Sequence, residues 1–219
     1  MNTPNSMIVP VVVALILGGI GGYFAASSMG ESVAEKEGTS SEVAMPEPSA
    51  NTAAVNTALA GTDEWKIQNA MSAAPEAISK DATVLDWPAK EGDQLRPLRA
   101  GTNTWTCTPD MPTSPGNDPF CGDEMSMQWF GAYMSKKTPK IAQAGIGYML
   151  QGGSDASNTD PFAVAPKEGE QWLSAPPHIM IFPVSKLDMK VYGTDPMSGK
   201  PWIMWAGTPY EHLMVPVQQ

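Results

Sequence analysis

Short apolar runs separated by polar residues, glycine and proline mark the C-terminal part of the chain. They comprise GIGYML (145–150), HIMIFPV (178–184), PWIMWAG (201–207) and HLMVPV (212–217). Apolar runs of this length between turn-forming residues predict β-strands. ATVLDW at 82–87 predicts one more short strand.

Residues 101–107 alternate between two kinds of side chain. Threonines occupy positions 102, 104 and 106, and the positions between and after them hold Asn103, Trp105 and Cys107. Successive side chains of a strand point to opposite faces, so this period of two predicts a half-buried strand.

Two stretches favour helices. Residues 63–80 follow Thr62, a typical N-cap, and Pro75 predicts that this helix is divided into two pieces. Residues 122–137 begin with acidic residues and end with lysines, which suits the helix dipole. Together these elements predict an α+β fold with a mainly antiparallel sheet of about five or six short strands and about two or three helices.

Residues 8–26 form an apolar segment without a charged side chain, and the first charge in the chain is Glu31. Such a segment is long enough to cross a bilayer core. The first 26 residues are therefore a signal sequence or a single transmembrane anchor. The glycines within 18–22 and the lack of Lys or Arg before residue 8 favour the anchor, whereas the small residues at 25–28 keep cleavage open.

Residues 27–62 lack aromatic side chains and are rich in Ser, Ala, Thr and Glu, which predicts a disordered tether. All seven tryptophans follow it, so residues 63–219 are expected to form the globular domain. The layout predicts an exported protein at the periplasmic or extracellular face of the inner membrane, held there through residues 8–26.

The formal net charge is −10, and every charged residue follows position 30. An acidic domain repels phosphate backbones and anionic lipid surfaces. We therefore expect no nucleic-acid partner, and a small ligand or an envelope protein instead.

Cys107 and Cys121 are the only cysteines, and thirteen residues rich in proline separate them. Redox pairs usually have two intervening residues, and a structural zinc site needs four ligands. A zinc site recruiting His178 and His212 would lack the usual ligand spacing. In an exported chain, a disulfide that closes this loop is the favoured interpretation.

The two histidines are the first candidate site. His178 and His212 both begin apolar runs, so they could meet at one end of a sheet as an acid/base or metal pair. Glu211 precedes His212, but adjacent residues of a strand point to opposite faces. The two side chains therefore cannot form a simple dyad if this segment is extended. A histidine bonded to backbone groups at a strand edge is the favoured alternative.

The segment QGGSDASNTDP at 151–161 is the second candidate. It brings Ser154, Asp155, Asn158 and Asp160 together after a predicted strand. It lacks both the phosphate-loop pattern and the EF-hand spacing, so a polar turn competes with a ligand site that includes His178. Methionines near the histidines suggest copper binding as a further alternative, but packing within the strands explains these methionines better. No metal ligand is assigned, and the cofactor is unknown.

Several segments together resemble a widespread set of small exported bacterial proteins of uncharacterised activity. They are GTNTWTCTPD, PGNDPFCGDEM with the following MQW, GYMLQGGSDASNTDP, SAPPHIM and GKPWIMWAGTPYEHLMVPV. The resemblance covers about Trp65 to the C-terminus. It implies an exported bacterial protein, but it implies no mechanism.

We expect a non-enzymatic exported module that binds a ligand or an envelope partner, because common nucleophile motifs are absent from the sequence. The alternative is a metal-assisted hydrolase that uses His178, His212 and Glu211 with Asp155 or Asp160.

Overall fold

The computed structural model describes residues 60–90 and 93–217, which belong to one compact unit. The expected anchor at 1–26 and nearly all of the expected tether lie outside the described residues. Within the described residues, no helix is long and apolar enough to cross a membrane.

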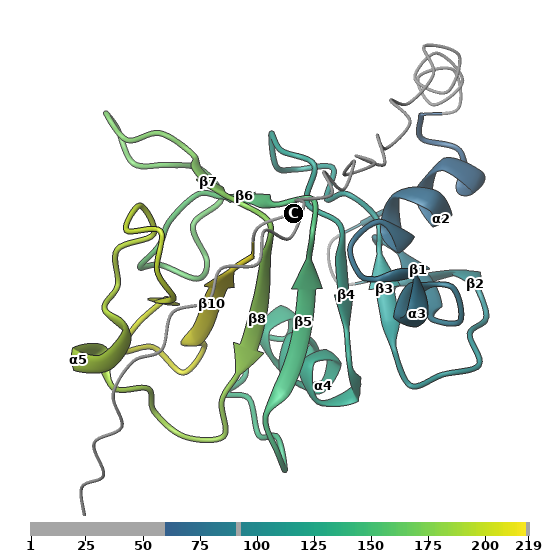
Figure 1. Cartoon of the computed structure of the whole chain (residues 1–219). Coiled ribbons are helices and arrows are strands. Elements are labelled where there is room, and N and C mark those ends of the chain that lie inside the picture. Colours follow the sequence, from purple (N-terminus) through teal and green to yellow (C-terminus); the bar gives the residue numbers. More distant parts are fainter. Residues whose placement is uncertain (1–59, 91–92, 218–219) are drawn as a thin grey trace, which may run out of the picture. The chain divides into compact units, whose positions relative to one another are not determined.

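The described residues form four helices and two sheets (Figure 1). The helices are α2 (Asp63–Met71), α3 (Glu76–Ser79), α4 (Glu124–Met134) and α5 (Met189–Tyr192). The strands are β1 (Thr83–Asp86), β2 (Arg96–Arg99), β3 (Thr106–Thr108), β4 (Phe120–Gly122), β5 (Gly145–Met149), β6 (Gly153–Asp155), β7 (Leu173–Ala175), β8 (His178–Phe182), β9 (Trp202–Met204) and β10 (His212–Pro216).

The main sheet has eight strands in the order β2-β1-β3-β4-β5-β8-β10-β9. Only the β1–β3 pair is parallel; the other neighbours are antiparallel, and β6 and β7 form a separate antiparallel pair. The predicted α+β class is confirmed. The predicted strand count was too low, because β2, β4, β6 and β7 are short segments without an extended apolar run.

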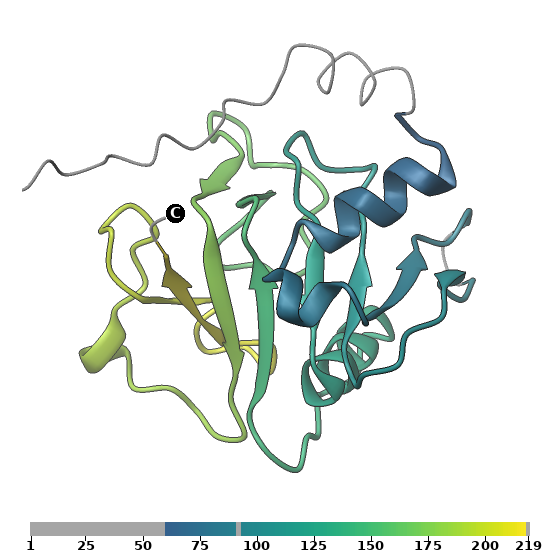
Figure 2. The same ribbon diagram turned by 45° about the vertical axis from the view of Figure 1, so that its right-hand side comes forward.

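The main sheet carries a hydrophobic core on each face. Phe120 and Cys121 are neighbours on β4 and therefore point to opposite faces. Phe120 belongs to the larger core, in which Trp129 of α4 packs beside Phe182 of β8. Cys121 belongs to the smaller core with alanines of α2, such as Ala70. Figures 1 and 2 accordingly place α4 on one side of the sheet and α2 with α3 on the other.

The helix boundaries follow the capping residues. The Thr62 side chain accepts a hydrogen bond from the Trp65 backbone N–H at 3.2 Å, and Pro75 is the N-cap of α3. The predicted division of the first helix is confirmed. Asp123 accepts from the Ser126 N–H at 2.8 Å and is the N-cap, so α4 begins at Glu124. The helix predicted at 122–137 was too long at both ends, because α4 ends at Met134.

The predicted strand at 101–107 was too long, because β3 begins only at Thr106. The Asn103 side chain accepts from the Trp105 N–H at 3.0 Å and donates to the Ile78 carbonyl at 2.9 Å. Such local side-chain bonds replace the ladder bonds of a strand. The alternation of the sequence therefore does not extend the sheet here.

Cys107 and Cys121 form a disulfide, as predicted. The two residues are directly paired across the antiparallel strands β3 and β4. The proline-rich segment between them is thus the connection of a β-hairpin, closed covalently at its base.

Candidate functional site

The two histidines do not meet at one end of the sheet, contrary to the expectation. Strands β8 and β10 run antiparallel, and His178 pairs with Pro216. His212 lies four residues away from Pro216 along β10, which is about 13 Å at the usual rise per strand residue. The strand starts that carry the histidines therefore lie at opposite ends of the pair.

Each histidine is a buried, neutral imidazole. His178 is 1% exposed and His212 is fully buried. Their Nδ1 atoms lie 2.7 Å from the Pro176 carbonyl and 3.0 Å from the Tyr210 carbonyl. Burial lowers the pKa of His178, and it lowers that of His212 to about 4. Each Nδ1 must donate to its carbonyl, which leaves Nε2 as an unpartnered acceptor within the described structure.

Aromatic rings surround His212. Its ring centroid lies 5.4 Å from Trp129, 5.4 Å from Phe182 and 5.1 Å from Trp205. This packing gives His212 a place in the larger core and no contact with solvent, so it has no route to an external proton acceptor.

The polar segment 151–161 folds against the disulfide hairpin. Ser154 and Asp155 lie on β6, and the Ser154 hydroxyl accepts from the Gly116 N–H at 3.0 Å and donates to Asp118 at 3.3 Å. Asp155 accepts from the Ser157 N–H at 2.8 Å. Burial, with the nearby charge of Asp118, raises the pKa of Asp155 to about 6.

The other predicted polar residues also stabilise the backbone. Asn158 donates to the Thr194 carbonyl at 2.8 Å, and Asp160 accepts from the Phe162 N–H at 3.0 Å. Among the described residues, the His178 side chain hydrogen-bonds only to the Pro176 carbonyl. None of these bonds joins the segment to this imidazole, although Gly153 pairs with Ala175 three residues before His178. The common site stays a prediction.

Glu211 joins two loops. Its carboxylate accepts from the Leu187 N–H at 3.0 Å through Oε1 and from the Gly207 N–H at 2.8 Å through Oε2. The side chain is only 8% exposed. Glu211 therefore fixes the connection after β8 against the turn before β10.

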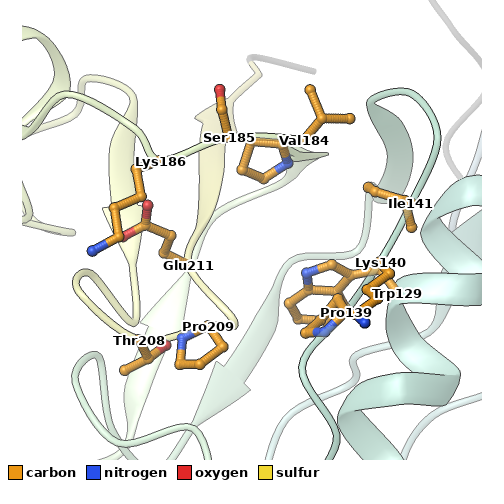
Figure 3. A pocket seen from close by; sticks show the side chains of 11 residues that line it. Trp129, Pro139, Lys140, Ile141, Val184, Ser185, Lys186, Thr208, Pro209 and Glu211 are labelled. Carbon is orange, nitrogen blue, oxygen red and sulfur yellow. The ribbon is translucent and has the colours of Figure 1, made fainter.

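A cleft of about 480 Å³ lies beside Glu211 (Figure 3). It is bounded by the segment 139–141 before β5, the segment 183–186 after β8, the turn at 208–211 and Trp129 of α4. The lining residues are Trp129, Pro139, Lys140, Ile141, Pro183, Val184, Ser185, Lys186, Thr208, Pro209 and Glu211. The antiparallel pairing of β5 and β8 explains this arrangement, because Gly145 at the start of β5 lies opposite Phe182 at the end of β8.

The lining of the cleft combines apolar side chains with polar ones, among them two lysines. Trp129, itself nearly buried, presents an edge of the aromatic core, and three prolines limit the freedom of the surrounding backbone. Among the described residues, neither Lys140 nor Lys186 forms an ion pair. Glu211 is the one carboxylate in the lining, and both its oxygens already accept backbone hydrogen bonds.

A second cleft, of about 610 Å³, lies beside Trp87. Its charges are mutually paired: Asp86 binds Lys66 and Arg96, each at 2.8 Å. Burial alone would raise the pKa of Asp86, but the hydrogen bonds from Lys66 and Arg96 outweigh it and lower the pKa. Arg96 also binds Asp63, so the network fastens α2 to β1 and β2 and leaves no cation of the network unpaired.

The sequence analysis missed the first cleft. Lys140 and Lys186 belong to no motif, and they are 46 positions apart in the numbering. The positions of the lysines relative to the predicted strands could have indicated the cleft. Lys140 lies shortly before the run at 145–150, and Lys186 lies shortly after the run at 178–184. If those runs pair antiparallel, both lysines come to the same end of the sheet.

Comparison with known proteins finds no matching family model, no similar curated protein and no similar solved structure. The site must therefore be interpreted from its own geometry. Within residues 60–90 and 93–217, no three His, Cys, Asp or Glu side chains are grouped so that they could hold a metal ion. The hydrolase alternative accordingly gains no support from the placement of its residues.

Proposed function

We propose that the domain is a non-enzymatic module of the cell envelope that binds a small anionic ligand in the cleft between 139–141 and 183–186. The observation that carries this proposal is the pair Lys140 and Lys186, which face one cleft without a carboxylate partner in the described structure. An acidic chain that keeps two unpaired cations beside a concave surface has a local preference for anions.

The composition of the cleft defines the ligand class. Its volume suits a small molecule, and its walls offer Ile141, Val184 and the edge of Trp129 for apolar contact. Ser185 adds a hydroxyl that can donate to an oxyanion. A ligand with one carboxylate or phosphate group and a short apolar part fits this lining.

Glu211 supports binding indirectly. Its bonds to the Leu187 and Gly207 N–H groups hold the two loops that form one side of the cleft. A preformed wall lowers the ordering cost of binding. The negative charge of Glu211 also reduces affinity for ligands with several anionic groups, which favours a monoanion.

The test is a binding series with butyrate and inorganic phosphate as anionic probes, and butanol and butylamine as neutral and cationic probes. We expect the anions to bind, and Lys140→Met or Lys186→Met to weaken the binding by about tenfold, because one charge-assisted contact is lost. Lys167→Met is the matched control, since Lys167 is exposed and lies outside the cleft.

Two results would overturn the proposal. One is binding of the neutral or cationic probe as tight as that of the anions. The other is turnover of ester, amide or glycoside substrates by the purified protein, with a rate that depends on the cleft residues.

A further inference from the structure

Strands β8 and β10 place a histidine and two methionines together on one face of the main sheet. Figure 1 shows these two strands side by side. Met180 of β8 pairs directly with Met214 of β10. His178 lies two residues before Met180 on β8, so its side chain points to the same face. This face carries the larger core, because Met214 belongs to that core and Met180 packs against it.

The register of the strands brings these three side chains within reach of one ion. Directly paired residues of antiparallel strands have Cβ atoms about 5 Å apart, and diagonal neighbours have them about 7 Å apart. Two residues along one strand span about 7 Å. An imidazole and two thioether side chains that start from these positions can converge on a point between them. The pairing thus groups one ring nitrogen and two sulfurs that no sequence motif connects.

The free ring nitrogen of His178 is a second, independent observation. His178 is 1% exposed, and its Nδ1 donates to the Pro176 carbonyl at 2.7 Å. Its Nε2 is therefore a buried acceptor without a hydrogen-bond partner among the described residues. Metal-ligating histidines commonly have this arrangement, with one nitrogen bonded to a carbonyl and the other holding the ion. A ligand that bonds to Nε2 would offset the penalty of burying this acceptor unpaired.

The contact between His178 and Trp202 shows where the imidazole lies. Trp202 is on β9, and β10 separates that strand from β8. Two strands with one strand between them lie about 10 Å apart. The ring centroids of His178 and Trp202 are only 6.5 Å apart. The two rings therefore lean towards each other over β10, the strand that carries Met214.

We propose that His178 Nε2 and the sulfurs of Met180 and Met214 bind a Cu(I) ion. Thioether sulfur selects Cu(I) among biological metal ions, and imidazole also binds copper. All three ligands are neutral, so a divalent ion such as Zn²⁺ would bring a larger uncompensated charge into the core. The search for groups of His, Cys, Asp and Glu within the described residues does not bear on this site, because two of its ligands are thioethers.

His178 fits this role better than His212. Both histidines have an unpartnered Nε2 in the described structure, and the two methionines lie between them along the strands. The His212 ring is enclosed by three aromatic rings. Beside His178, Met180 is only half-buried, so an ion can reach the sulfur from solvent by displacing side chains.

This inference does not rest on the proposed anion site. His178, Met180 and Met214 do not line the cleft between 139–141 and 183–186. Binding of butyrate or phosphate is therefore expected to stay unchanged when the two methionines are replaced. A failure of the copper proposal can thus be distinguished from a failure of the proposed function.

The experiment titrates the metal-free full-length chain with Cu(I) under anaerobic conditions, in competition with the chromophoric Cu(I) chelator bicinchoninate. No thiol reductant is added, so that the disulfide stays closed. Met180→Leu and Met214→Leu should each weaken Cu(I) binding at least about tenfold, because losing even an outer partner of a metal ligand typically has this effect. X-ray absorption of the wild-type complex should show both sulfur and nitrogen ligands, and this readout needs no variant.

Two matched variants control for effects of methionine itself. Met204→Leu changes a methionine of the same core that is 5% exposed and pairs with His212. Met197→Leu changes one that is 80% exposed. Both should keep the wild-type affinity. Leucine preserves the volume and apolar character of methionine, so all four variants should fold, and urea unfolding of the metal-free proteins checks this.

Four outcomes would overturn the proposal. The first is equal Cu(I) affinity of the wild type and the double variant Met180→Leu/Met214→Leu, which would mean that these sulfurs only pack. The second is an equal loss of affinity in Met204→Leu, which would point to His212 instead. The third is Zn²⁺ binding as tight as Cu(I) binding. The fourth is an X-ray absorption spectrum without sulfur ligands.

Discussion

At the scale of single residues, the two histidines show how burial decides chemistry. Histidine is the side chain most often used for proton transfer near neutral pH. His178 and His212 instead donate through Nδ1 to a nearby carbonyl and keep Nε2 in the core. Their lowered pKa values hold both rings neutral at pH 7. Both rings are packed in the interior of the domain.

Replacing His178 tests this structural role. His178→Ala should lower the free energy of unfolding by roughly 2 kcal/mol or more, because it removes a buried ring and strands the Pro176 carbonyl. Urea unfolding followed by fluorescence measures the change. A variant with unchanged stability but impaired ligand binding would restore the imidazole as a site residue.

Asp155 predicts a pH-dependent stability. Its folded pKa of about 6 lies above the ordinary 3.8, so the folded chain binds the proton more tightly and loses stability as pH rises from about 4 to about 6. Asp155→Asn removes this loss. The stability of the variant relative to wild type should rise across that window by at most about 1.4 kcal/mol per pH unit, and then level off. Urea unfolding of both proteins at several pH values provides the measurement. A difference in unfolding free energy that does not change with pH would contradict the raised pKa of Asp155.

At the scale of elements, the disulfide hairpin organises one half of the sheet. Strands β3 and β4 have only three residues each, yet they connect the parallel β1–β3 pair to the long antiparallel strands. Cys107 and Cys121 hold these short strands in register. The hairpin connection then provides the Gly116 and Asp118 contacts for Ser154 of β6.

Removing the disulfide should therefore destabilise the domain. The double variant Cys107→Ala/Cys121→Ala is expected to lose about 3 kcal/mol of unfolding free energy, since a loop of this length is no longer closed in the unfolded chain. Chemical denaturation without reductant measures the loss. A matched wild-type sample in reductant should show a similar loss, and unchanged stability in both samples would contradict the role given to the bond.

At the scale of the whole molecule, charge and exposure are distributed unevenly. The chain has 23 acidic and 13 basic residues, yet the surface around the first cleft is lysine-rich. The ion network of the second cleft neutralises Lys66 and Arg96, whereas the lysines beside the first cleft stay unpaired among the described residues. The two clefts have similar volumes, but only the first has lysines without an ion-pair partner among the described residues.

The full-length chain is predicted to be held at a membrane through residues 8–26. We expect it to pellet with membranes and to resist carbonate extraction, because nineteen uncharged residues can span the bilayer core. Fractionation with N-terminal sequencing provides the measurement. Extractable protein whose N-terminus maps near Ser27 or Ser28 would mean that the segment is a cleaved signal sequence.

The sequence by itself determined the α+β class, the capped and divided first helix, the longer strands and the disulfide. These features depend on local spacing and on a single pair of cysteines, which can be read along the chain. The three-residue strand β4 was not predicted and the strand that contains the start of β3 was predicted too long, because pairing with neighbouring strands stabilises these segments and their own apolar pattern does not.

Only the tertiary structure decided where the functional groups meet. The antiparallel register of β8 and β10 separates His178 from His212, and that of β5 and β8 brings Lys140 and Lys186 to one cleft. Strand order and direction arise from packing between distant segments. The sequence shows which chemical groups the protein contains, but the pairing of the strands determines which of these groups lie close together.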